Sequence, residues 1–215
     1  MTEDDREAEL REALFRSYRY LDDHRLTELA SGNVSCRFGD GCLISPTGAT
    51  AATIRPESFV RTDARGKLLG PGRPSSELPL HLAIYRARPD AGAIVHTHSD
   101  HCVALASCGL GIPGFHYLVG GFGGNDVPFI PYATFGTDAL AATTAEALRD
   151  RKACLLANHG AVCHDADVAR ATTNAHRLEI LARQYILALN AGKPICLTVD
   201  QWAEYREMAR KMQYL

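Results

Sequence analysis

The chain has 215 residues, of which 46% are hydrophobic and 22% charged, and its formal net charge at pH 7 is -2. This length is enough for one large domain with a substantial core, and the composition is ordinary for a globular protein. The small net charge excludes binding to nucleic acid through bulk basicity, and no segment approaches the ~20 apolar residues of a membrane-spanning helix. We therefore expect neither nucleic acid nor a membrane among its partners.

The cysteines and the N-terminal residues both favour a cytoplasmic location. The seven cysteines are scattered and include no Cys-x-x-Cys pair, which disfavours a disulfide framework and a cysteine-based zinc site. The first ten residues, MTEDDREAEL, are acidic and lack the basic start and apolar stretch of a signal peptide. We expect a protein of the reducing cytoplasm.

The N-terminal part of the chain combines one helix pattern with two strand patterns. Apolar residues at Leu10, Leu14 and Leu21 predict a helix over 4–23. The segment 33–48 predicts two short strands, which are joined by a Gly-Asp-Gly turn and followed by a Pro-Thr-Gly turn.

A helix, a strand and a second helix come next. Serine caps and apolar spacing predict a helix over 75–88. Pro79 is tolerated only in the first turn of that helix, which places its start near Ser75. A short β-branched run then predicts a strand over 93–98, and another capped helix follows over 99–107.

The segment 109–114 reads GLGIPG and matches the G-x-G-x-x-G pattern of dinucleotide-binding loops. That fingerprint requires a helix that opens inside the motif. Pro113 and the β-favouring residues 115–119 do not supply one, so we exclude a dinucleotide site.

The C-terminal part of the chain continues the alternation. We expect a helix over 138–148, a strand over 153–157 and a short strand over 161–164. A long helix over 165–192 ends at a glycine before a proline, and a last helix runs from about Asp200 to the end. No repeat or linker divides the chain, so we expect a single α/β domain.

Two histidines close the predicted strand over 93–98. Residues i and i+2 of a strand project to the same face, so the imidazoles of His96 and His98 are expected to stand side by side. Two such imidazoles form half of a metal site. On this motif alone, a hydrogen-bonded and half-buried histidine pair is the alternative.

A third histidine and a carboxylate complete the candidate metal site. His159 directly follows an apolar strand and precedes Gly160, a position from which a side chain can point into a cleft. Three histidines leave a fourth coordination position open for substrate or water, as a catalytic zinc requires. Glu77, at the start of its predicted helix, is a candidate for a further ligand or for a base. The ordinary alternative is that the helix dipole favours a negative charge there.

Two segments carry the features of an anion site. Ser75 and Ser76 lie at a predicted helix N-terminus, where free N–H groups and the dipole attract negative charge. Thr47 and Gly48 lie in a turn whose hydroxyl and backbone donors are suited to the same anion. Taken singly, each segment is also typical of an ordinary cap or turn.

Several segments together resemble the class II aldolase/adducin family. They are SGNVSCR, SPTG, PSSE, RPDAGAIVHTHSDHC, IPGFHYLVGGFGGNDVPFIPYATFGT, LLANHG and the closing MQYL. The longest is the most specific because it combines rare residues over a fixed length, whereas the histidine-pair segment is shared by the whole family. The resemblance covers nearly the whole chain. It implies one domain over residues 1–215, with a central, largely antiparallel β-sheet flanked by helices.

The resemblance implies a metal centre and a phosphate pocket. His96, His98 and His159 match the family's zinc ligands, with one Zn2+ per subunit, although Mn2+ or Co2+ stays open. Glu77 matches the acidic residue that approaches the metal and acts as acid and base. The family's phosphate pocket is matched by Asn33, Thr47, Gly48, Ser75 and Ser76.

Two tyrosines complete the implied catalytic set. Tyr117 matches a tyrosine that handles the proton of the aldehyde oxygen and reaches the site from an adjacent subunit. Tyr214 matches a second tyrosine, contributed near the C-terminus across the subunit interface. The resemblance thus implies a cyclic homotetramer with active sites between subunits.

The implied activity is reversible cleavage of a ketose 1-phosphate, of the L-fuculose 1-phosphate type, to dihydroxyacetone phosphate and an aldehyde such as L-lactaldehyde. Zinc would act as a Lewis acid and Glu77 would move the proton. An aldolase for 5-deoxyribulose 1-phosphate or 5-methylthioribulose 1-phosphate stays open, as do a pentulose-phosphate 4-epimerase and a sugar-phosphate dehydratase. A non-catalytic adducin-like module is disfavoured because no metal ligand is missing.

Three places depart from the family pattern. They are the segment LASGN at 29–33, Phe122 in place of a smaller residue, and Lys211 in place of an aromatic one. We expect these positions to line the aldehyde end of the pocket.

Overall fold

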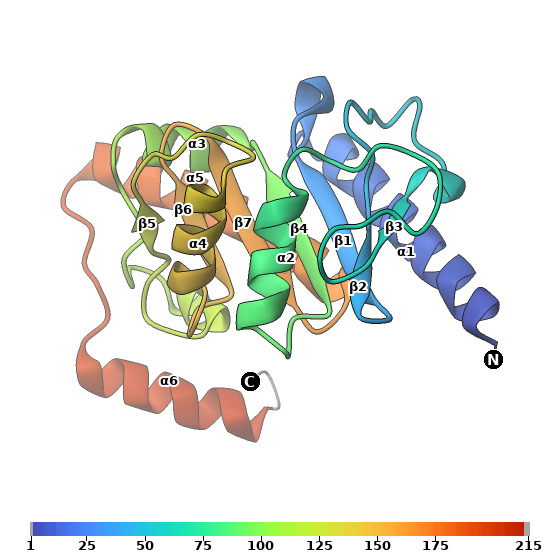
Figure 1. Cartoon of the computed structure of the whole chain (residues 1–215). Coiled ribbons are helices and arrows are strands. Elements are labelled where there is room, and N and C mark those ends of the chain that lie inside the picture. The colour runs from blue at the N-terminus through green and yellow to red at the C-terminus, as the bar shows by residue number, and fades with distance from the viewer. Residues whose placement is uncertain (1, 213–215) are drawn as a thin grey trace.

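The computed structural model describes residues 2–212, in which helices and strands alternate along the chain (Figure 1). The helices are α1 (Glu3–Asp23), α2 (Leu78–Ala87), α3 (Asp100–Ser107), α4 (Asp138–Ala147), α5 (Val168–Ala191) and α6 (Val199–Lys211). Short 3-10 helices are η1 (Glu28–Ala30), η2 (Pro56–Ser58) and η3 (Tyr117–Phe122). The strands are β1 (Asn33–Phe38), β2 (Gly41–Ile44), β3 (Val60–Thr62), β4 (Ala93–Thr97), β5 (Phe129–Ile130), β6 (Ala153–Leu156) and β7 (Gly160–Asp165).

The strands form one seven-stranded sheet in the order β3-β2-β1-β4-β7-β6-β5. All neighbouring strands are antiparallel except β5 and β6, which run parallel. Helices cover both faces of this sheet (Figure 1). The expected α/β fold, with a largely antiparallel sheet flanked by helices, is therefore confirmed.

Each face of the sheet has its own apolar core. One core joins the sheet to α1, α3 and α5, and the other joins it to α2 and α4, which lie in front of the sheet in Figure 1. Successive residues of β4 point to opposite faces, so Val95 belongs to the first core and Ile94 to the second. His96 therefore faces α2, as does its cross-strand partner Asn33 on β1.

Most of the expected elements have the predicted bounds to within a few residues, but the short strands β3 and β5 were not predicted. These strands are two or three residues long, which is too short for an alternating apolar pattern to show. Among residues 2–212, no helix combines the length and the apolar character that a membrane crossing needs.

The predicted start of α2 was wrong. The helix begins at Leu78 rather than near Ser75, and the two residues before it form a turn. The N–H of Ser75 donates to the carbonyl of Ser45 (3.0 Å), while the Ser75 hydroxyl accepts from the N–H of Glu77 (3.2 Å). These bonds hold Ser75 in a non-helical conformation. Pro79 still lies in the first turn, where it has no helical hydrogen bond to lose.

The β-favouring residues 115–119 lead into the 3-10 helix η3 instead of a strand. The glycines around η3 allow α6 to pack closely against it. A Cβ atom on Gly120 would lie 2.3 Å from Cε1 of Tyr205 and 2.9 Å from Cζ3 of Trp202. Trp202 is buried in this contact. The glycine-rich segment is therefore the packing surface for α6.

Candidate active site

The structure brings the three predicted histidines together at one end of β4. His96 lies on the buried strand β4, one residue before its end, His98 directly follows the strand, and His159 lies in the turn between β6 and β7. The Nε2 atoms of His96 and His98 are 2.9 Å apart, and the three ring centroids lie 4.8 to 4.9 Å from one another.

Gly160 makes the approach of His159 possible. A Cβ atom at this position would lie 2.2 Å from the carbonyl oxygen of Thr97, which is closer than any side chain tolerates. Only glycine therefore lets β7 begin directly beside the end of β4. As a result, the turn that carries His159 is placed next to His98.

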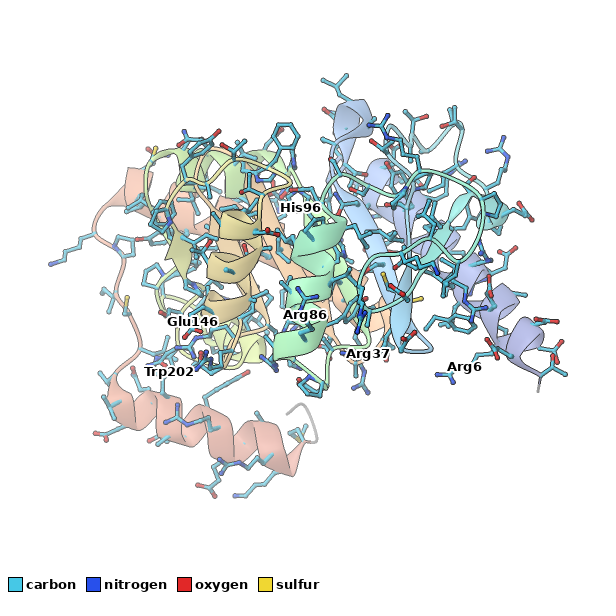
Figure 2. All side chains as sticks on the ribbon, viewed as in Figure 1. Arg6, Arg37, Arg86, His96, Glu146 and Trp202 are labelled. Carbon is cyan, nitrogen blue, oxygen red and sulfur yellow. The ribbon has the colours of Figure 1, made fainter. Side chains whose placement is uncertain are left out.

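Glu77 adds a carboxylate to the three imidazoles. It is the N-cap residue of α2, and in Figure 2 His96 lies at that N-terminal end of the helix. Its Oε2 atom is 2.9 Å from Nε2 of His96, and its Oε1 atom is 3.4 Å from Nε2 of His159. The ligand atoms of Glu77, His96, His98 and His159 all lie within 4.8 Å of one another.

The cluster of Glu77, His96, His98 and His159 has the donor set of a divalent cation site. Three imidazole nitrogens and one carboxylate oxygen are common ligands of catalytic zinc. Within residues 2–212, the buried Oε1 atom of Glu77 has no hydrogen-bond partner. A buried polar atom without a partner is costly, and a cation at the centre of the cluster would satisfy it. These residues therefore fit a bound metal ion.

The surroundings prepare the imidazoles to act as ligands. Although burial opposes it, the charge of Glu77 raises the pKa of His96, so without a metal its Nε2 carries a proton. Nδ1 of His96 donates to the carbonyl of Ala161 (3.0 Å), so a metal that displaces the other proton binds the lone pair of Nε2. Burial, assisted by the charge of His96, lowers the pKa of His98 to about 3 and that of His159 to about 4. Both rings are therefore neutral near pH 7, which is the form that binds metal.

Glu77 is held as a carboxylate. Burial alone would raise its pKa, but the charge of His96 and the hydrogen bond between the two outweigh burial. The net result is a pKa well below the usual range of a glutamate. The side chain is therefore an anion that faces three imidazoles, and it makes no capping hydrogen bond to the helix backbone.

A pocket of about 290 Å³ opens beside this cluster. An isolated β-bridge between Pro46 and Pro74 brings the two candidate anion-binding loops together. The N–H of Thr47 donates to the carbonyl of Arg73 (3.1 Å) and so keeps the loops in contact. The pocket is lined by Glu77, His98 and His159, by the predicted phosphate residues Asn33, Thr47, Gly48, Ser75 and Ser76, and by Ala30, Ser31, Gly32, Pro46 and Phe135.

The loop residues of this pocket offer backbone donors as well as hydroxyls. Gly48 has a φ of +70°, which a glycine adopts without strain. Among the hydrogen bonds of residues 2–212, none uses the N–H of Gly48 or of Ser76. Free N–H groups beside the hydroxyls of Thr47 and Ser76 are suited to the oxygens of an anion.

Asn33 lies between the pocket and a buried histidine that sequence reasoning missed. Its Nδ2 atom donates to Oε2 of Glu77 (3.0 Å), and its Oδ1 atom accepts from Nε2 of His81. His81 is fully buried, one helical turn after Glu77 on α2. The available signal was the spacing of Glu77, His81 and Tyr85, which places polar groups on one helical face at intervals of four residues.

The two predicted catalytic tyrosines lie outside this pocket or outside the described residues. Tyr117 is on η3, where its ring stacks on His116 and its side chain is half exposed. It does not line the pocket of its own chain. Tyr214 lies outside the described residues. That both tyrosines act in the site of an adjacent subunit stays a prediction.

The sequence profile of the class II aldolase and adducin N-terminal domain matches residues 12–186. The chain belongs to this family. A 5-methylthioribulose-1-phosphate/5-deoxyribulose-1-phosphate aldolase of Rhodospirillum rubrum is 42% identical over 192 residues, covering 89% of this chain and 87% of that protein. An L-fuculose phosphate aldolase of Shigella flexneri is 40% identical over 176 residues, covering 82% of each protein.

The fold agrees with these sequence relationships. The solved structure of an L-fuculose 1-phosphate aldolase matches this one with a TM-score of 0.87 at 32% identity, over 95% of this chain and 96% of that chain. The relatives named here are aldolases, so the chain is a class II aldolase rather than a non-catalytic adducin-like module.

Only one of the three departures from the family pattern lines the pocket described here. Ala30, Ser31 and Gly32 do line the pocket. Phe122 does not, and the expectation was wrong, because its ring is fully buried in the core between η3 and the sheet. Lys211 lies on α6, where it pairs with Glu207 (2.7 Å) and does not reach the pocket of its own chain.

Proposed function

We propose that this chain is a zinc-dependent aldolase that reversibly cleaves a ketose 1-phosphate to dihydroxyacetone phosphate and an aldehyde. L-Fuculose 1-phosphate, which gives L-lactaldehyde, is the first candidate substrate. One observation carries the proposal: Glu77, His98 and His159 share a single pocket with Thr47, Gly48, Ser75 and Ser76. A phosphate held by the serine and threonine loops would place the rest of the sugar at the cluster.

A second substrate has equal support from the relatives. The aldolase for 5-methylthioribulose 1-phosphate and 5-deoxyribulose 1-phosphate from Rhodospirillum rubrum is as similar to this chain as the L-fuculose phosphate aldolases are. All of these substrates share the phosphorylated ketose end and differ in the aldehyde end. The donors described here face the shared end, so the choice between them rests on residues at the other end.

The residues of the chain supply the proton transfers that cleavage needs. Breaking the C3–C4 bond requires that the C4 hydroxyl lose its proton, and it leaves the three-carbon fragment as an enediolate that must gain a proton at C3. A divalent cation bound to the cluster supplies Lewis acidity toward the oxygens of the ketose. Glu77, a buried carboxylate at the edge of the pocket, is placed to carry the proton at C3. Tyr117 of an adjacent subunit is the candidate for the proton at the C4 oxygen.

The decisive experiment is an assay of dihydroxyacetone phosphate release over a panel of ketose 1-phosphates, with and without chelator. We expect release from at least one member, and we expect the chelator to abolish it. A pentulose-phosphate epimerase would convert its substrate without net release, and a dehydratase would release water instead. Either of these results would overturn the aldolase proposal.

A test of the phosphate pocket follows from the position of Ser76. Replacing Ser76 by alanine removes one hydroxyl donor to a charged group, which is worth ~1.5–3 kcal/mol. We therefore expect KM for the phosphorylated ketose to rise about 10- to 100-fold, with a much smaller change in kcat. Ser107→Ala, an exposed position on α3 outside the pocket, is the matched control. Equal cleavage of the unphosphorylated ketose by the unmodified enzyme would show that the pocket does not bind phosphate.

The remaining expectations belong to the same proposal. They are zinc rather than manganese or cobalt, a cytoplasmic location, a homotetramer with active sites between subunits, and one domain over residues 1–215. The family profile supports the domain over 12–186. Metal analysis of the purified protein and its mass in solution test the metal and the assembly.

A further inference from the structure

A line of buried polar side chains runs from Glu77 into the protein, away from the pocket. Its members, called the buried ladder below, are Glu77, Asn33, His81, Ser35 and Tyr85, all at most 5% exposed. They alternate between α2 and β1. In Figure 2 the labelled His96 lies near one end of α2 and the labelled Arg37 toward the other. Arg37 donates to the carbonyl of Tyr85 (2.9 Å).

The spacing of the ladder follows from the geometry of a helix beside a strand. Glu77, His81 and Tyr85 are four residues apart on α2, and four residues advance a helix by about 6 Å. Asn33 and Ser35 are two residues apart on β1, and two residues advance a strand by about 6.6 Å. These steps nearly match, so each strand residue fits between two helix residues.

The hydrogen bonds of the ladder have a single direction. Asn33 donates from Nδ2 to Glu77, so its Oδ1 must accept, and Nε2 of His81 must therefore be the donor. Nδ1 of a neutral His81 is then an acceptor for the hydroxyl of Ser35 (2.7 Å). Ser35 in turn accepts from the hydroxyl of Tyr85 (2.8 Å). In each hydrogen bond of the ladder, the donor is thus the residue farther from Glu77.

The burial of His81 supports this arrangement of protons. Burial lowers the pKa of its imidazole to about 3, so the ring is neutral near pH 7. A neutral ring has one donor and one acceptor nitrogen, and both are used here. The tautomer is decided by Asn33, whose Oδ1 can only accept from Nε2, and the Ser35 hydroxyl then donates to Nδ1.

We propose that His81 is a positioning residue for Glu77 and acts through Asn33. By fixing the Asn33 amide, it holds Oε2 of the carboxylate and turns the unpartnered Oε1 toward the centre of the histidine cluster. The ladder thereby sets the direction in which the acid/base of the site faces. This inference rests on the proposed function for its effect on cleavage, but its effect on metal binding is independent of the substrate.

A purely structural role makes a different prediction. If the ladder only joined α2 to β1, its loss would lower thermal stability and leave kcat and metal affinity of the folded enzyme unchanged. Removal of a group that orients a ligand typically costs 10–100-fold in metal affinity or activity. Measurements of kcat and of the zinc dissociation constant therefore distinguish a positioning role from a purely structural one.

The test compares His81→Gln with His81→Asn in the full chain. The glutamine amide reaches the place of Nε2 and can still donate to Asn33, whereas the shorter asparagine amide occupies the place of Nδ1 and cannot. Both variants replace a ring by a small amide, so their packing defects are similar. We expect His81→Asn to lose about 10–100-fold in kcat, with KM changed less than about threefold, and to bind zinc more weakly in competition with a chelator. His81→Gln should retain most of both.

Equal kcat and zinc affinity in the two variants, with only a lower melting temperature, would overturn the inference. If neither His81 variant folds, Ser35→Ala replaces them, because it removes the hydrogen-bond partner of His81 Nδ1, and with it a restraint on the ring, at little cost in volume. As with His81→Asn, kcat should fall and zinc binding should weaken. An unchanged kcat and zinc affinity in Ser35→Ala would again overturn the inference. If the unmodified protein cleaves no ketose phosphate, the proposed function fails, and the zinc affinities alone decide the role of His81.

Discussion

Replacing His159 or His96 by alanine is expected to remove the bound metal and with it the aldolase activity. Each variant would leave two imidazoles, so Glu77, which the proposed mechanism needs as the acid and base, would have to serve as the third ligand. Loss of Lewis acid catalysis costs several kcal/mol, so we expect the rate to fall on the order of a thousandfold or more. Metal content per subunit and the rate of dihydroxyacetone phosphate release are the measurements.

The two variants differ in what they do to the fold. His96 is fully buried in the sheet and donates to Ala161, so its removal also creates a cavity and some loss of stability. His159 lies in a turn and is only partly buried, which makes His159→Ala the cleaner test. His24→Ala, at an exposed histidine after α1, is the control and should keep both metal and activity. Full activity in either cluster variant would contradict a metal centre at these residues.

Glu77→Gln is expected to keep the metal and to lose about 10²–10⁴-fold in rate, the usual contribution of a general acid or base. As a residue at a helix N-terminus, Glu77 would contribute only ~0.3–1 kcal/mol to stability through the helix dipole. The structure favours the larger effect, because the carboxylate makes no capping bond and faces His96 and His159. Glutamine keeps the shape and can still pair with Asn33, but it cannot carry a proton.

Proton exchange at C3 of dihydroxyacetone phosphate gives the sharper measurement for this variant. Exchange needs no aldehyde, so it reports the acid/base step apart from carbon–carbon bond cleavage. We expect exchange and cleavage to collapse together in Glu77→Gln, while metal content stays at the level of the unmodified enzyme. Exchange at the unmodified rate would show that another group is the base, and Tyr117 would be the next residue to replace.

The sequence by itself determined the features that depend on neighbours in the chain. The strand that ends in His96 and His98 was readable because alternation over two residues decides the face of a side chain. Most helix and strand bounds follow from apolar spacing and caps over one or two turns. The third histidine, Glu77 and most loop residues of the pocket were candidates from their places beside predicted strands, turns and a helix start, and the family motifs added Asn33, Tyr117 and Tyr214.

The tertiary structure decided the contacts between segments that are far apart in the sequence. The bridge between Pro46 and Pro74 holds the two candidate phosphate loops together and delays the start of α2 to Leu78. Local propensity favoured an earlier start, but the bond from Ser75 to Ser45 outweighed it. Similarly, Phe122 belongs to the core because η3 turns it inward, which its glycine-rich neighbours did not predict.

The buried ladder is the clearest case of contacts that the sequence could not predict. Glu77, His81 and Tyr85 could be assigned to one face of a helix from the sequence, and Asn33 and Ser35 to one face of a strand. Neither segment alone predicts that these faces meet. The order of the strands and the position of α2 against the sheet depend on the packing of the whole domain. Once they meet, burial forces each polar group to find a partner, and the hydrogen-bond directions follow.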